Sequence, residues 1–161
     1  MKPLPTPEEL TRIEAAKRAS VVQLLFKCAR LANEEALERV RQKSGVTNLR
    51  ASHTALFPHI DFEGTRLTVL AQRLGISKQA VGQLVGELEQ MGTLERVPDP
   101  SDGRAKLIRF SAQGRRWMME GLGVLKEVEE DYAQKIGHER MEALYDALIA
   151  LERVLDPPSE A

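Results

Sequence analysis

The sequence predicts a mainly α-helical chain with one small β-hairpin. Hydrophobic residues make up 42% of the 161 residues but aromatic residues only 4%, so we expect a core of Leu, Val, Ile and Ala. Apolar residues recur at helical spacing through long stretches at both ends of the chain. Two short strand-like runs, about Leu94 to Val97 and Lys106 to Phe110, flank the turn Pro100-Ser101-Asp102-Gly103.

The N-terminal third predicts two helices. Thr6 with Pro7 and Glu9 forms a capping box, so a helix should begin there and either run to about Ser44-Gly45 or break near Ala32-Asn33. A second helix is expected from Thr47 to about His59, with Pro58 near its end.

The stretch from Leu67 to Arg116 carries most of the functional information. A short helix from Thr68 to Leu74 ends at Gly75, and Ser77 caps a second helix that Gly92 ends. Two short helices around a tight turn, followed by a hairpin, are the layout of a winged helix-turn-helix, which places its second helix in the DNA major groove.

The second helix has the two faces that base recognition requires. Its apolar residues, spaced to face a core, are Val81, Leu84, Val85, Leu88 and Met91. Lys78, Gln79 and Gln83 lie on the other face, and the amides can present donors and acceptors to base edges. Ser77 and Thr68, at helix starts, suit contacts with phosphates.

The hairpin should place Arg104 at its tip, where a narrow minor groove attracts a guanidinium group. We expect Asp102 to orient that guanidinium, and Lys106 and Arg109 to support phosphate binding. The charge distribution agrees: basic residues exceed acidic ones by four in residues 66–117, and acidic residues exceed basic ones by seven in residues 118–161.

The C-terminal part predicts a long helix capped by Ser111 and broken at Gly137, then a last helix from about Glu139 to Leu155. Both have an apolar stripe, as does the N-terminal helix. We therefore expect three parts: dimerisation helices at 1–46, a DNA-binding domain at 47–111 and further dimerisation helices at 112–161. A two-fold dimer would place its recognition helices about 34 Å apart on a pseudo-palindromic site in double-stranded DNA.

The motif region resembles the MarR family of winged-helix bacterial regulators over about 50 residues. The matching positions are Leu70-Ala71, Leu74-Gly75-Ile76-Ser77, Val81, Leu84-Val85, Leu88, Gly92, Glu95-Arg96, Asp99-Pro100, Asp102, Arg104, Ser111 and Gly114. The chain departs from the family at Gly103, where members often carry a second Arg, and at Gly82, where a larger polar residue is frequent.

This resemblance implies a homodimer built from the first and last helices, with a small-molecule pocket between them and the DNA-binding part. Arg18, His53 and Phe57 are candidate pocket residues. It also implies a sequence-specific transcriptional regulator, most simply a repressor that a ligand releases from DNA.

Other functions have less support. The three His residues are scattered and the single Cys has no partner, so neither a metal site nor a disulfide is expected, and we find no catalytic motif and no cofactor motif. Cys28 lies on an apolar stripe, which favours a buried thiol over a redox sensor.

Because of the departures at Gly82 and Gly103, an alternative hypothesis remains: a winged-helix protein-interaction module that has lost DNA binding. Neither a membrane span nor a signal peptide is expected, which favours the cytoplasm.

Overall fold

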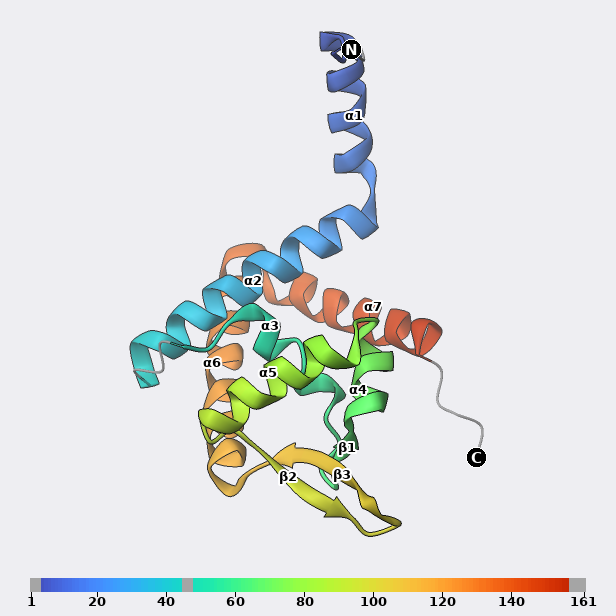
Figure 1. The fold of residues 1–161 in the computed structure, drawn as a ribbon. Coiled ribbons are helices and arrows are strands. Elements are labelled where there is room, and N and C mark those ends of the chain that lie inside the picture. The colour runs from blue at the N-terminus through green and yellow to red at the C-terminus, as the bar shows by residue number, and fades with distance from the viewer. Residues whose placement is uncertain (1–3, 45–47, 157–161) are drawn as a thin grey trace.

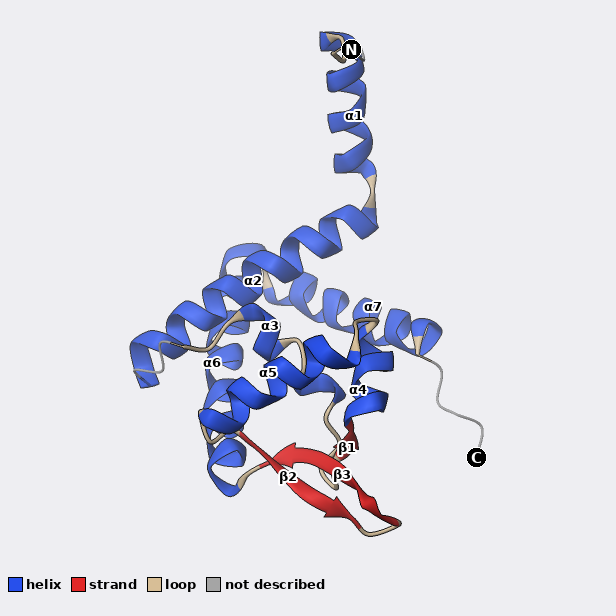
Figure 2. Ribbon diagram, viewed as in Figure 1, coloured by secondary structure: helices blue, strands red, loops and turns tan. Residues whose placement is uncertain are grey.

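The computed structural model describes residues 4–44 and 48–156 (Figure 1). The elements follow in the order α1 (Pro7–Ala19), α2 (Val21–Ser44), α3 (Ala51–Thr54), η1 (Phe57–His59), β1 (Thr65–Arg66), α4 (Leu67–Leu74), α5 (Lys78–Gln90), β2 (Leu94–Asp99), β3 (Asp102–Phe110), α6 (Ala112–Ile136) and α7 (His138–Leu155). Helices make up most of the molecule, and the strands gather at one end of it (Figure 2). The predicted fold class is confirmed.

The N-terminal helix is broken, but not where the sequence suggested. The capping box at Thr6 and Glu9 is present, with the Thr6 hydroxyl accepting from the Glu9 amide at 3.2 Å. The break falls at Ser20, whose extended backbone separates α1 from α2 and whose hydroxyl accepts from the Gln23 amide. Ala32-Asn33 lies inside α2. A serine can cap a helix without any neighbouring Gly or Pro, so the residue pattern did not mark this position.

The single helix predicted from Thr47 to His59 is wrong. Thr47 lies outside the described residues, and the rest forms the one-turn α3 and the 3₁₀-helix η1. Pro58 disfavours the α conformation of Phe57, and the Thr54 hydroxyl bonds back to the Ala51 carbonyl at 3.1 Å.

The three strands form an antiparallel sheet in the order β1-β3-β2. Leu94 pairs with Phe110, and the pairing continues to Asp99 and Asp102, with an irregularity between Pro98 and Asp99. The strands are longer than the sequence predicted, so the hairpin extends well away from the helices (Figure 1).

One apolar core holds this part of the chain together. Its buried members are Leu56, Ile60, Leu70, Val81, Val85, Leu88, Leu94, Ile108 and Phe110. The rings of Phe57 and Phe110 meet edge to face at a centroid distance of 5.5 Å, an arrangement that adds to the area they bury. The core therefore joins α4, α5 and the sheet into one unit.

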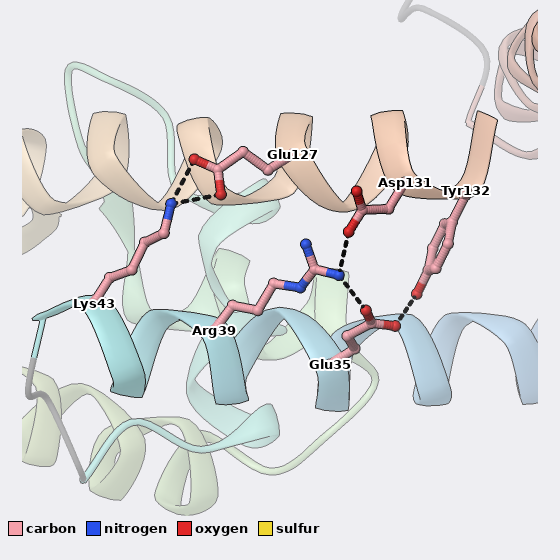
Figure 3. A network of polar contacts seen from close by, with 6 residues as sticks. All are labelled: Glu35, Arg39, Lys43, Glu127, Asp131 and Tyr132. Carbon is pink, nitrogen blue, oxygen red and sulfur yellow. Dashed lines mark hydrogen bonds and ion pairs between the residues drawn. The ribbon is translucent and has the colours of Figure 1, made fainter. Parts of the chain in front are cut away.

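Helices α2 and α6 pack side by side through a line of polar contacts (Figure 3). Arg39 of α2 binds Asp131 of α6 at 2.7 Å and Glu35 of its own helix at 2.6 Å. The Tyr132 hydroxyl donates to Glu35 at 2.7 Å, and Lys43 binds Glu127. Beside them, Ala36, Leu37, Val124 and Val128 are buried.

The two outer helices are far less covered. Helix α1 has no buried residue and stands away from the body of the molecule in Figure 1. Helix α7 also has none, and its apolar residues Leu144, Tyr145, Leu148 and Leu151 are exposed. Within the described ranges, no helix is long and apolar enough to cross a membrane.

Helix α6 begins in close contact with the loop before β2. The Ser111 hydroxyl donates to the Gly92 carbonyl at 2.6 Å and accepts from the Gly114 amide at 2.8 Å. A Cβ atom built on Gly114 would lie 1.9 Å from the Thr93 carbonyl oxygen. Only glycine therefore lets α6 dock here without moving the backbone.

We predict that Gly114→Ala lowers the free energy of unfolding by about 1–3 kcal/mol, because the backbone must shift to relieve the overlap. Urea unfolding followed by circular dichroism measures this. Gly86→Ala, in α5 where a Cβ meets nothing within 4 Å, is the control, and it should raise stability by roughly 0.5–1 kcal/mol. Equal stability of Gly114→Ala and the wild type would contradict the close contact.

The base of the hairpin turn is held by a buried carboxylate. Asp99 accepts from the Ser101 hydroxyl at 2.7 Å, from the Ser101 amide at 2.8 Å and from Arg66 at 2.6 Å. These bonds, those from Ser101 first, lower the pKa of Asp99 from 3.8 to about 2. A pKa lowered by folding means that the ionised form stabilises the fold, and that this contribution is lost as the pH falls through the folded-state pKa.

We therefore predict that Asp99→Asn lowers the thermal midpoint at neutral pH, and that the difference from the wild type shrinks as the pH falls from about 4 to about 2. Thermal unfolding at a series of pH values measures this. Asp102→Asn, at an exposed neighbouring site, should shift the midpoint less. If the difference in thermal midpoint stays constant over this pH range, the ionisation of Asp99 does not contribute to stability.

Candidate nucleic-acid interface and ligand cavity

Helix α5 is fixed in rotation by its buried face. Val81, Val85 and Leu88 have no exposed surface. Gln79 and Gln83 are consequently exposed on the outer side, and Lys78 is exposed at the start of the helix. The turn before the helix is also as expected, because Gly75 is left-handed (φ 64°) and the Ser77 hydroxyl accepts from the Ala80 amide at 3.2 Å. Thr68 is exposed in the first turn of α4.

The hairpin is tied to the helix-turn-helix by Arg66. This residue precedes α4, and its guanidinium reaches Asp99 and the Ser101 hydroxyl near the turn. Helix α4, the start of α5 and the hairpin tip all lie on the right-hand side of Figure 1. The Arg66–Asp99 bond therefore ties the hairpin turn to the start of α4.

Asp102 was predicted to orient the guanidinium of Arg104, and the structure does not show this contact. Its carboxylate accepts from the backbone amide of Arg104 at 3.1 Å, not from the Arg104 guanidinium. A bond two residues along the chain shapes the turn backbone, which is the usual role of Asp in such turns. Arg104 and Lys106 are both exposed on β3.

Most basic side chains between residues 66 and 117 already have partners. Arg66, Arg73, Arg96 and Arg109 bind carboxylates, and Arg115 and Arg116 bond to neighbouring oxygen atoms. Arg109, expected to support phosphate binding, is instead bound to Glu95 at 2.8 Å. In the described part of the chain, no carboxylate lies within ion-pairing distance of Lys78, Arg104 or Lys106. These three cations are available to phosphates.

A buried histidine links α3 to α5. His53 of α3 is fully buried and its Nδ1 accepts from the Arg50 amide, so its proton lies on Nε2 and is donated to Glu87 of α5 at 2.9 Å. Arg50 also contacts the Glu87 carboxylate. The bond from His53, followed by that from Arg50, lowers the pKa of Glu87. Glu87 in turn accepts from the amide of Gln83 at 3.3 Å.

A cavity of about 1110 Å³ lies between α2, the segment 48–58, the loop before β2, the end of β3 and α6. Its walls are mostly apolar, and Phe57, Trp117 and Met118 contribute the largest side chains. Of the three predicted pocket residues, only Phe57 lines it. His53 is turned toward Glu87, and Arg18 lies on the exposed α1, so neither of these two predicted residues lines the cavity.

Several residues of these sites were missed from the sequence. Trp117 was read only as part of an apolar stripe, and Glu87, Asn33 and Thr54 carried no pattern of their own. Glu87 had one available signal, its position one turn after Gln83 on the same helix. Nothing local in the sequence places Asn33 beside Thr54, which is 21 residues away.

Cys28 was predicted to be buried, but its side chain is exposed on α2 in this single chain. The apolar stripe to which it belongs faces solvent here. Within residues 4–44 and 48–156, no group of His, Cys, Asp or Glu side chains could hold a metal ion.

Comparison with known proteins supports this interpretation of the sequence. Residues 50–105 match the model of the MarR family. No curated protein matches the chain. A MarR-family transcriptional regulator from Rhodococcus sp. RHA1 is 23% identical, with a TM-score of 0.63 over 85% of this chain and 94% of that one.

Two solved structures of CouR are also similar. The transcriptional repressor CouR bound to a 23-mer DNA duplex is 20% identical, with a TM-score of 0.63 over 94% of this chain and 100% of that one. CouR from Rhodococcus jostii RHA1 bound to p-coumaroyl-CoA is 23% identical, with a TM-score of 0.61 over 90% of this chain and 98% of that one.

Residues 50–105 are thus similar to the MarR family, and the chain as a whole has the fold of MarR-family transcriptional regulators.

Proposed function

We propose that this protein is a homodimeric repressor that binds a pseudo-palindromic operator and is released by a small molecule. One observation supports the proposed DNA binding. Cations without a carboxylate partner and exposed side-chain amides lie together on the winged helix-turn-helix. Lys78, Gln79 and Gln83 lie on the outer face of α5, and Arg104 and Lys106 on the hairpin. In this assignment α5 enters the major groove and the hairpin tip contacts the minor groove.

Thr68, Ser77 and Asp102 have supporting roles in this proposal. Thr68 and Ser77 offer hydroxyl groups near the starts of α4 and α5, where backbone amides also favour a phosphate. Asp102 shapes the turn that presents Arg104. The rigid link from Arg66 to Asp99 keeps the two contact elements at a fixed spacing, so that one duplex can meet both.

The helices of residues 1–46 and 112–161 supply the dimer interface, on either side of the DNA-binding domain at 47–111. An isolated helix as short as α1, with 13 residues, is marginal in water, so it needs a packing partner. The exposed apolar residues of these helices include Leu10, Ile13, Val22, Phe26, Leu144, Leu148, Leu151 and Leu155. A second copy of the chain offers the matching surface.

The cavity is the proposed effector site. It lies between the dimerisation helices and the DNA-binding domain, so a ligand there that favours one spacing of the two parts would change DNA affinity. That a CouR structure contains p-coumaroyl-CoA supports a small-molecule effector here, although identities near 20% do not transfer the ligand.

The test of DNA binding compares two variants. We predict that Arg104→Ala weakens binding to the DNA flanking the protein's own gene and reduces the salt slope of log K by about 1, because one phosphate-region contact is lost. Gln83→Ala or Gln79→Ala should instead relax base preference at one position by about 1–3 kcal/mol. Fluorescence anisotropy at two salt concentrations, with random DNA as competitor, measures both.

Arg140→Ala, on α7 away from the hairpin, removes the same charge and should leave binding unchanged. If the protein binds no site in this DNA, and selection from a random pool also yields none, the result favours the alternative function, a protein-interaction module. If neither Gln variant alters base preference, α5 is not the reading helix.

Dimerisation has its own test. We predict that Leu148→Glu, in the exposed apolar stripe of α7, converts the dimer to a monomer and weakens operator binding, because a charge would be buried in the interface. Light scattering after size-exclusion chromatography measures the mass. Ala150→Glu is the matched control, since it lies about 200° around the helix from Leu148. A wild-type protein that is already monomeric would refute the dimer.

A further inference from the structure

The one cation among the described lining residues of the cavity is already paired. Three of these residues carry a charged side chain: Lys43, Glu120 and Glu127. Lys43 binds both carboxylate oxygens of Glu127 across the α2–α6 contact, each at 2.5 Å (Figure 3). The lining therefore offers a ligand no unpaired cation, while the carboxylate of Glu120 would repel an anion.

The other cations on the same part of α2 are occupied in the same way. Arg39 bonds to Glu35 and Asp131 (Figure 3), and Arg41 bonds to Glu38 and to the Leu49 carbonyl. A carboxylate or phosphate placed in the cavity would meet a lysine whose charge is already balanced by Glu127. The described lining residues carry two carboxylates against this one cation, so the arrangement disfavours anions.

The cavity does contain a neutral polar anchor. Thr54 of α3 lies 3.1 Å from the Asn33 side-chain oxygen of α2 and also 3.1 Å from the Ala51 carbonyl. Its one hydroxyl proton serves only one of these acceptors at a time. If it goes to Ala51, the Asn33 amide turns to donate to Thr54. Either way, one half of the Asn33 amide has no partner among the described residues.

We propose that the cavity binds an uncharged, mainly apolar molecule, such as an aromatic skeleton with one hydroxyl or carbonyl group, and discriminates against its anionic analogues. The proposal rests on the cavity being the effector site of the proposed function. Trp117, Phe57 and Met118 supply the apolar contacts, and the free half of the Asn33 amide bonds to the polar group. A volume of about 1110 Å³ is ample for such a skeleton.

This differs from the solved complex of CouR. A coenzyme A thioester such as p-coumaroyl-CoA carries phosphate groups, for which the lining of this cavity has no unpaired cation. The inference therefore assigns a ligand chemistry that similarity to CouR would not suggest.

Two dyes with one skeleton test the proposal. N-phenyl-1-naphthylamine is uncharged, and its 8-sulfonate is the same molecule with one negative charge. The chain has a single tryptophan, Trp117, in the cavity wall, so energy transfer from it reports a dye bound there. We expect the neutral dye to bind saturably and at least about tenfold more tightly than the sulfonate, with transfer lost in Trp117→Phe while direct excitation still shows binding.

A charge variant gives the second arm. Glu127→Gln releases Lys43 as an unpaired cation, so it should raise affinity for the sulfonate severalfold and leave that for the neutral dye unchanged. Glu129→Gln makes the same charge change at an exposed site on α6 outside the cavity and should alter neither affinity.

The same preparation is tested for operator binding, which separates this inference from the proposed function. Equal or tighter binding of the sulfonate by the wild type, or no saturable binding of the neutral dye, overturns the ligand class even if DNA binds. If the protein binds the neutral dye selectively but binds no operator, the result supports the proposed ligand class and contradicts the proposed repressor function.

Discussion

The burial of one face of α5 is the constraint on which both proposed binding surfaces depend. Val81, Val85 and Leu88 are fully buried against α4, the sheet and the segment before β1. Rotating the helix by one residue, about 100°, would replace them with Gly82, Gly86 and Glu89 and so bury a carboxylate in place of apolar side chains. The direction of Gln79 and Gln83 therefore follows from core packing.

The four-residue helix α3 connects this surface to the cavity. Its His53 is bonded to Glu87 of α5, and its next residue, Thr54, lines the cavity and contacts Asn33 of α2. An element this short has little internal stability, so its position is set by what packs on either side. Helix α3 thus links the cavity wall to α5 through two adjacent residues, His53 and Thr54.

The sequence was informative where structure is local and uninformative where contacts are distant. The caps at Thr6, Ser77 and Ser111, the left-handed Gly75 and the bounds of α6 were all predictable, because each depends on neighbours within one helical turn. The role of His53 was not, since its partner Glu87 is 34 residues away. Asp102 and Arg104 were correctly placed at the turn but wrongly paired, because the backbone amide is closer to the carboxylate than the flexible guanidinium is.

The ion pairs between α2 and α6 matter more for chemistry than for stability. Pairs this exposed contribute at most about 1 kcal/mol each, so the packing of Leu37, Val124 and Val128 must hold the helices together. Hydrogen bonds from Tyr132 and then Arg39 lower the pKa of Glu35, which keeps the Glu35–Arg39 pair ionised at neutral pH. By pairing Lys43, these contacts leave the described lining of the cavity without an available positive charge. Lys78, Arg104 and Lys106 have no carboxylate partner among the described residues, so the proposed DNA surface is cationic while the proposed ligand cavity is not.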